Sequence, residues 1–150
     1  MMDQAVLREV TLTLPMLPDM EIAASKTATA MAEYMSMSPD RIDEVRMAVV
    51  EACINAIEHS GAPDRKVHIT FSILGDPVPE KLQIEITDLG VGFEPDEVEE
   101  PKIEEKLKAN RKRGWGLKII EGLMDEVELE TGSRGTTVRM TKSGQPEKAS

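Results

Sequence analysis

The stretch EACINAIEHS, residues 51–60, is largely apolar but places Glu51, Asn55 and His59 at successive four-residue steps. On a helix each such step turns the side chain by about 40°, so the three polar groups span about 80° of the circumference. A carboxylate buried there is costly unless it has a partner. From these residues alone two interpretations remain open: a stripe that faces a ligand, or a helix edge at the solvent boundary.

The residues before this stretch continue its helix toward the N-terminus. One apolar row repeats at helical spacing, which is typical of a helix packed on a core. The row consists of Ile42, Val45, Val49, Ala52 and Ala56. Ser38 and Pro39 have the residue types of an N-cap and a first helical position. Gly61 and Pro63 are typical of a helix end, so the sequence predicts one helix over residues 39–60.

Alternating apolar and polar residues predict strands on both sides of this helix. We expect the strands over residues 6–14, 66–73, 81–88, 127–131 and 136–140. Two further helices are expected: one over residues 19–36 with Asp19 as its N-cap, and a short one after the glycines at 114–116.

The order of these elements is strand, two helices, two strands, helix and two strands, which does not fit a doubly wound fold. Strands joined by tight turns favour antiparallel pairing, and three helices are enough to cover one face of a sheet. The sequence therefore predicts an α+β fold: a two-layer α/β sandwich with a mixed, mostly antiparallel sheet covered on one face by helices. We expect one domain over residues 1–142 and a polar C-terminal tail, SGQPEKAS, over residues 143–150.

The composition excludes several classes of function. The chain of 150 residues has a net charge of −10, from 18 basic and 28 acidic residues, whereas a nucleic-acid-binding surface needs a basic footprint. It has no apolar run long enough for a transmembrane helix, and MMDQAVLREV lacks the features of a signal peptide. Cys53 is the single cysteine. We expect a cytoplasmic protein that binds neither nucleic acid nor membrane.

Methionine is unusually frequent, with ten residues against four aromatic ones, which favours an adaptable aliphatic core. Four of the methionines lie on or next to the first expected helix: Met20, Met31, Met35 and Met37. They either pack on the sheet or form a contact surface for a partner, and the sequence alone leaves both roles open.

Three short motifs follow the helix of residues 39–60 in the chain. In ITDLGVGF, residues 86–93, Asp88 has the inward parity of its strand, and Gly90 and Gly92 allow a ligand to approach the backbone closely. An inward carboxylate could accept a hydrogen bond from an adenine amino group. On its own, the motif fits equally well an Asx turn at the end of a strand.

The other two motifs are RGWGL, residues 113–117, and GTT, residues 135–137. Gly114 and Gly116 precede a helix start, where unpaired N–H groups favour phosphate, and Arg113 beside them is a natural phosphate ligand. Thr136 has inward strand parity. On its own, RGWGL also fits a flexible hinge. On its own, GTT also fits a threonine with a purely structural role.

In order and spacing the motifs resemble the N, G1, G2 and G3 boxes of the GHKL superfamily, whose ATP-binding domain is the Bergerat fold. The resemblance covers roughly residues 6–142. Within the superfamily, four stretches of this sequence are similar to those of the anti-sigma factor serine/threonine kinases. They are EACINAIEHS, DLGVGF, RGWGLKIIEGLMDEVE and GTTVRM.

The resemblance implies a role for each matching residue. Glu51 matches the catalytic general base, Asn55 the Mg²⁺ ligand, and Asp88 the adenine-reading aspartate, which Thr136 supports. His59 matches a supporting position.

Further matches concern the nucleotide. Gly90 and Gly92 correspond to positions along the base and ribose, and residues 93–113 to the ATP lid. Four residues match the family positions where the ATP lid meets the phosphates: Arg113, Gly114, Gly116 and Leu117.

The resemblance also implies ATP and Mg²⁺ as cofactors and a homodimer. The implied partners are a STAS-domain anti-anti-sigma factor, which is phosphorylated on serine, and a sigma factor, which is sequestered. Three alternatives stay open: a detached histidine-kinase catalytic domain, a switch-type kinase whose STAS scaffold substrate activates a phosphatase, and a non-catalytic ATP-binding interaction module.

Overall fold

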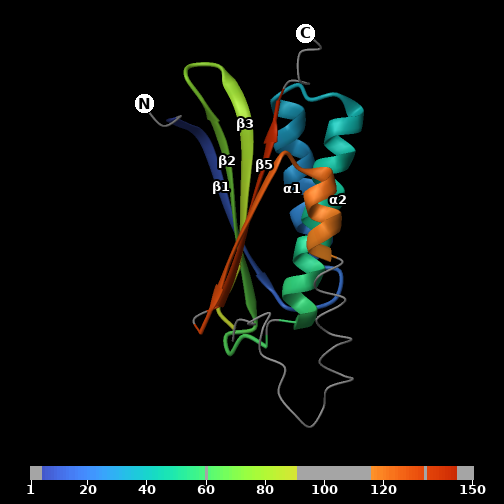
Figure 1. Ribbon diagram of the computed structural model, residues 1–150, viewed down its shortest axis with the longest axis vertical. Coiled ribbons are helices and arrows are strands. Elements are labelled where there is room, and N and C mark those ends of the chain that lie inside the picture. Colours follow the sequence, from blue (N-terminus) through green and yellow to red (C-terminus); the bar gives the residue numbers. More distant parts are fainter. Residues whose placement is uncertain (1–4, 60, 91–115, 134, 145–150) are drawn as a thin grey trace.

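The computed structural model describes residues 5–59, 61–90, 116–133 and 135–144. Its strands are β1 (Ala5–Pro15), β2 (Lys66–Gly75), β3 (Pro79–Asp88), β4 (Glu126–Gly132) and β5 (Gly135–Ser143), and its labelled helices are α1 (Glu21–Tyr34) and α2 (Pro39–His59). Residues 116–123 form a further helix, drawn in orange in Figure 1. The strands make one sheet in the order β1-β2-β3-β5-β4.

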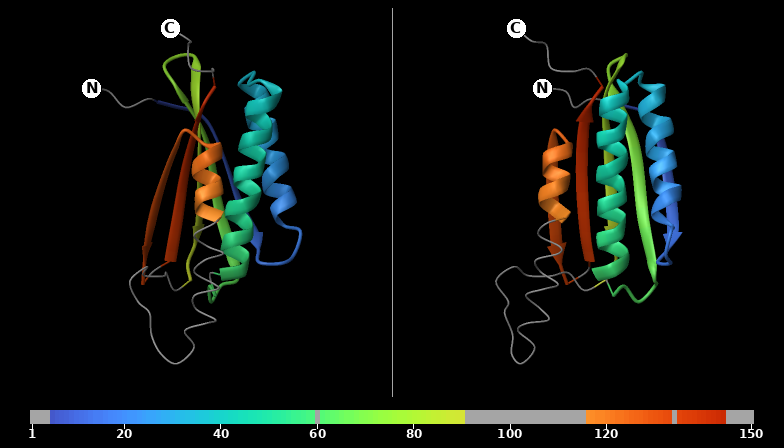
Figure 2. Two further views of the ribbon diagram at one scale, coloured as in Figure 1. Left: turned by 45° about the vertical axis from the view of Figure 1, so that its right-hand side comes forward. Right: turned by 90° about the vertical axis from the view of Figure 1, so that its right-hand side faces the viewer.

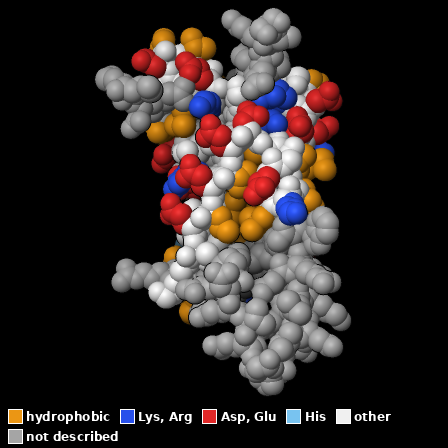
Figure 3. Space-filling model, viewed as in Figure 1, with side chains coloured by type: hydrophobic (Ala, Val, Ile, Leu, Met, Phe, Trp, Pro, Cys, Tyr) orange, Lys and Arg blue, Asp and Glu red, His pale blue; other side chains and the backbone are white. Residues whose placement is uncertain are grey.

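The molecule has two layers, with the helices side by side on one face of the sheet (Figures 1 and 2). The predicted α+β sandwich is therefore confirmed. The prediction allowed a mixed sheet, but all four strand pairings in the described residues are antiparallel. Acidic side chains are spread over the described part of the face in Figure 3, in keeping with the net charge of −10.

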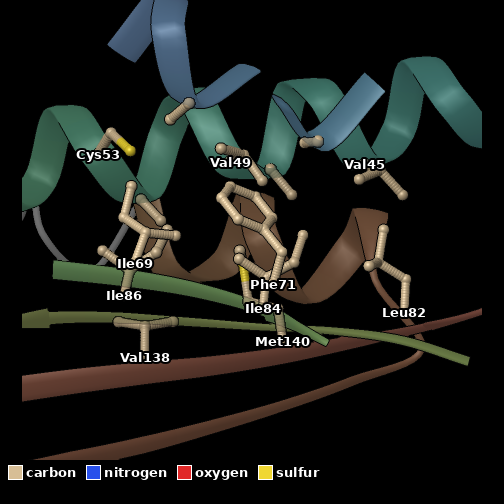
Figure 4. Packing of buried hydrophobic residues seen from close by; sticks show 14 of the residues in the cluster. Val45, Val49, Cys53, Ile69, Phe71, Leu82, Ile84, Ile86, Val138 and Met140 are labelled. Atoms are coloured by element: carbon tan, nitrogen blue, oxygen red, sulfur yellow. The ribbon is translucent and has the colours of Figure 1, made fainter. Parts of the chain in front are cut away.

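The core lies between α2 and the inner face of the sheet. Figure 4 shows Val45, Val49 and Cys53 of α2 over Phe71 and its neighbours on the strands, and Phe71 is fully buried. Burial is the main reason why the pKa of Cys53 rises to about 12, with the charge of Glu21 as a smaller cause. The thiol therefore stays protonated and packs as a small apolar side chain.

The two predicted N-caps have different outcomes. The Ser38 hydroxyl accepts a hydrogen bond of 3.3 Å from the Arg41 N–H, which confirms the start of α2. The Asp19 cap is wrong, because α1 begins at Glu21 and its N-cap residue, Met20, makes no side-chain cap. Asp19 has a φ of 73°, so its backbone turns the chain into the helix instead of taking the extended geometry of a cap.

The hairpin between β2 and β3 is tighter than the sequence predicted. The sequence predicts strands over residues 66–73 and 81–88, but Leu74 also pairs with Lys81 and Gly75 with Pro79. A Cβ at Gly75 would lie 1.9 Å from the carbonyl oxygen of Val78, so only glycine fits this close approach. The strands consequently extend further into the turn than the alternation of residues indicated.

The methionines of the first helical region belong to the core. Met31, Met35 and Met37 are buried, and Met20 packs against the same cluster. This decides the question that the sequence left open in favour of core packing. None of the helices in the described part of the chain combines the length and the apolar character that a membrane crossing requires.

Replacing Phe71 by alanine should lower the free energy of unfolding by about 3–5 kcal/mol, because it leaves a large cavity under α2. Urea unfolding followed by circular dichroism measures the change. Val78→Ala is the control: this side chain is 64% exposed, and its loss should change stability by less than about 0.5 kcal/mol. Equal changes in the two variants would contradict the central place of Phe71.

Candidate nucleotide site

A pocket lies between α2, the inner face of the sheet and the helix of residues 116–123. Its lining is Ala52, Asn55, Ala56, Ile86, Asp88, Leu117, Leu129, Thr136 and Val138. The lining is mostly apolar with three polar side chains, the composition expected of a small-molecule site. The free space is about 20 Å³, room for about one water molecule.

Asp88 is the last residue of β3, and its side chain is 3% exposed. Its Oδ1 accepts a hydrogen bond of 3.1 Å from the Gly90 N–H. The Asx turn, one of the two interpretations of this motif, is therefore present. The same carboxylate also lines the pocket, so the turn holds Asp88 in place and does not exclude contact with a ligand.

Thr136 on β5 is the direct neighbour of Asp88 across the sheet. Its hydroxyl lies 3.0 Å from the hydroxyl of Thr131 on β4. Gly135, just before it, has a φ of 128°, and a Cβ there would lie 2.1 Å from the Asp88 carbonyl oxygen. Glycine therefore lets β5 begin directly beside the end of β3.

Helix α2 brings Asn55 into the pocket, where it is 9% exposed, and Glu51 lies half-buried one turn earlier. The first turn of the helix of residues 116–123 packs against both. A Cβ added to Gly116 would lie 2.3 Å from Asn55 Nδ2 and 2.8 Å from Glu51 Oε1. The close approach of Gly116, and the place of Leu117 in the pocket wall, join the RGWGL motif to the polar stripe of α2.

The structure thus brings together six of the predicted site residues: Glu51, Asn55, Asp88, Gly116, Leu117 and Thr136. Gly90 is buried beside Asp88. Gly92, Arg113, Gly114 and the expected lid of residues 93–113 lie outside the described residues. His59 is the last residue of α2, and its side chain also lies outside them.

Sequence reasoning missed the walls of the pocket and one polar neighbour. Ile86, Leu129 and Val138 fall within expected strands and are not among the predicted site residues, yet they line the pocket. Thr131 was not singled out, although it pairs directly with Thr136. The alternation along the strand places Thr131 on the same face as Leu129, and this could have been read from the sequence. The sequence does not show that β4 pairs with β5 in the register that brings Thr131 opposite Thr136.

The family resemblance implies Mg²⁺, and the residues present fit such an ion. The Asn55 amide is buried close to the Glu51 carboxylate, since both lie against the backbone of Gly116. Oxygen ligands of this kind suit Mg²⁺, which keeps several waters and binds largely through substrate phosphates. Among the described residues there is no group of three His, Cys, Asp or Glu that could hold a metal by itself.

Comparison with known proteins identifies the family of this chain. The profile of the histidine kinase-like ATPase domain matches residues 14–142. The chain belongs to this family. Within this ATPase family it is similar to the serine-protein kinase RsbW of Bacillus subtilis (strain 168), 30% identical over 139 residues, which cover 89% of this chain and 84% of that protein. RsbW of Bacillus licheniformis is 33% identical over 122 residues, covering 77% of this chain and 73% of that protein.

A solved structure shows the same ATPase fold. The crystal structure of the RsbU and RsbW domains of Rv1364c from Mycobacterium tuberculosis superposes with a TM-score of 0.67 at 19% identity. The match covers 93% of this chain and 33% of that one, so this chain spans about one third of the solved protein.

Gly135→Ala should destabilise the site end of the sheet, because alanine disfavours a φ of 128° and its Cβ would meet the Asp88 carbonyl oxygen. We expect the free energy of unfolding to fall by more than about 1 kcal/mol. Gly132→Ala, in the same hairpin, is the matched control, since a Cβ there meets nothing within 4 Å. Thermal unfolding compares the two, and an unaffected Gly135→Ala variant would refute the steric argument.

Proposed function

We propose that this chain is an ATP-dependent serine/threonine protein kinase that acts as an anti-sigma factor. The observation that carries the proposal is the convergence of Asp88, Thr136 and Asn55 on one pocket, with Glu51 one helical turn beyond it. Membership of a family of ATPase domains and similarity to proteins named serine-protein kinase support the same conclusion.

The base of ATP would bind in the pocket. Asp88 is an acceptor-only group when ionised, and it suits the amino group of adenine, which donates hydrogen bonds. The apolar walls, with Ile86 and Val138 among them, suit the faces of a flat ring. Thr136, held by Thr131, would orient the remaining edge of the base, directly or through a water. Gly90 and Gly92 would lie along the base and ribose.

The phosphates would lie toward Glu51 and the start of the helix of residues 116–123. Backbone N–H groups at a helix start and the helix dipole favour anions. The glycine at 116 lets this helix start approach Asn55 and Glu51 closely. Arg113 and Gly114 are proposed to add contacts to the same phosphates. Asn55 would bind Mg²⁺ through its amide oxygen, and the ion supplies neutralisation of phosphate charge.

In the chemical step, Glu51 would act as general base. Its carboxylate takes the proton of a substrate serine hydroxyl while the serine oxygen bonds to the γ-phosphorus. The bond from that phosphorus to the bridging oxygen of ATP breaks, which leaves phosphoserine, ADP and a protonated Glu51. Phosphoryl transfer needs mainly positioning and charge neutralisation. One general base beside the bound nucleotide is therefore enough for the chemical step.

The proposed protein substrate is a STAS-domain anti-anti-sigma factor, and the proposed inhibited partner is a sigma factor. We further propose a homodimer that works in the cytoplasm. The net charge of −10 is compatible with a basic region on a partner. These assignments rest on the similarity to the RsbW kinases.

Glu51→Gln should lower the rate of phosphoserine formation at least 100-fold, because general bases contribute about 10²–10⁴ to a rate. The assay combines the chain, Mg²⁺ and radiolabelled ATP with a cognate STAS protein. Binding of a fluorescent ADP analogue should persist. Glu58→Gln, an exposed glutamate on the same helix, is the matched control and should retain activity. Full activity in Glu51→Gln would sink the base assignment, and an inactive wild type would favour the non-catalytic alternative.

Asp88→Asn should weaken ATP binding by about 10- to 100-fold, because a hydrogen bond to a charged group contributes about 1.5–3 kcal/mol. Isothermal titration calorimetry gives the Kd, and Tm values taken in parallel exclude unfolding. Asp43→Asn is the control, because this exposed aspartate lies 3.3 Å from Arg46 on the same helix and does not line the pocket. Equal ATP affinity in wild type and Asp88→Asn would remove the adenine-reading role.

A further inference from the structure

A second polar cluster lies at the opposite end of α2 from the pocket, and the proposed mechanism does not use it. Its centre is Lys142 on the inner face of β5, which is 4% exposed. The Lys142 ammonium donates a hydrogen bond to the Leu123 carbonyl and lies 3.5 Å from Glu44 Oε1 and 4.0 Å from Asp125 Oδ1. A buried cation needs such partners, because its desolvation is costly.

Each partner of Lys142 belongs to a different part of the fold. Leu123 is the last residue of the helix of residues 116–123, so Lys142 lies at the C-terminal end of its dipole, where a positive charge is favourable. Glu44 is on α2, and Asp125 follows the short helix on the way to β4. One ammonium group therefore contacts two helices from the sheet.

Arg41 of α2 strengthens the same junction. Its guanidinium donates to Asp125 Oδ2 at 3.2 Å and to the Ser143 carbonyl at 2.7 Å. Asp125 Oδ2 also accepts a hydrogen bond of 2.7 Å from the Ser143 N–H. Lys142 and Arg41 together thus fasten α2, the end of the short helix and β5 to one another.

The short helix connects this junction to the candidate nucleotide site. Its eight residues span roughly 12 Å at 1.5 Å per residue. Leu123, at one end, accepts the Lys142 hydrogen bond, and Gly116, at the other, packs against Asn55 and Glu51. A hydrogen-bonded helix of two turns moves as a unit, so a shift at Leu123 also moves Gly116 and Leu117.

We propose that Lys142 is a positioning residue for the nucleotide site. It holds the helix of residues 116–123 against α2, so that Gly116 stays beside Asn55 and Leu117 stays in the pocket wall. The inference rests on the proposed function only in that the pocket binds a nucleotide. Lys142 touches neither substrate nor nucleotide, and its effect passes through the short helix.

The test replaces Lys142 by methionine, which keeps most of the side-chain volume and removes the charge. We expect the Kd for a fluorescent ADP analogue and the KM for ATP to rise about tenfold, with a much smaller change in the KM for the STAS substrate. Lys66→Met, an exposed lysine at the start of β2, is the matched control and should leave both constants unchanged. Lys142→Arg, which keeps the charge, should recover part of the affinity.

A purely structural role gives a different result. Lys142→Met would then have a lower Tm but wild-type nucleotide affinity well below that temperature, and this outcome overturns the proposal. If Lys142→Met does not fold, Glu44→Gln removes one partner only and should raise the Kd about threefold; an unchanged Kd in that folded variant overturns it equally. A wild type that binds nucleotide without transferring phosphate would refute the proposed kinase function and leave this inference standing.

Discussion

Helix α2 buries Val45, Val49 and Cys53 against the inner face of the sheet, and this packing fixes the rotation of the helix about its axis. Once that rotation is set, Glu51 and Asn55 face the side where the helix of residues 116–123 packs. Asn55 therefore reaches the pocket, with Glu51 one turn away, because the apolar face of the same helix is buried in the core. The catalytic proposal depends on the same burial that stabilises the fold.

Two glycines let the backbone come close enough to complete the site. A side chain at residue 116 would overlap Asn55, and one at residue 135 would overlap the Asp88 carbonyl. Both glycines lie where separate elements meet: the short helix with α2, and β5 with β3. Their importance comes from the absence of a side chain, which packing against a distant segment makes necessary.

Charged groups have different roles on the two faces of the sheet. On the outer face, hydrogen bonds to Glu85 and Glu128 raise the pKa of the Arg139 guanidinium, but such exposed pairs contribute little to stability. On the inner face, Lys142 is buried and cannot exchange its partners for water. Its contacts with Leu123 and Glu44 join the short helix and α2 to β5, and the proposed positioning role rests on them.

The sequence by itself determined the order of the elements, the phase of α2, the Ser38 cap and the inward parity of Asp88 and Thr136, because periodicity shows which face of an element a residue occupies. Periodicity does not show which elements are neighbours. Only the tertiary structure decided that β3 lies beside β5, so that residues 88 and 136 meet, and that Lys142 reaches Leu123. The prediction of Asp19 as an N-cap was wrong for a related reason. The positive φ of Asp19 is set by the path of the chain from β1 into α1, which local residue preference does not encode.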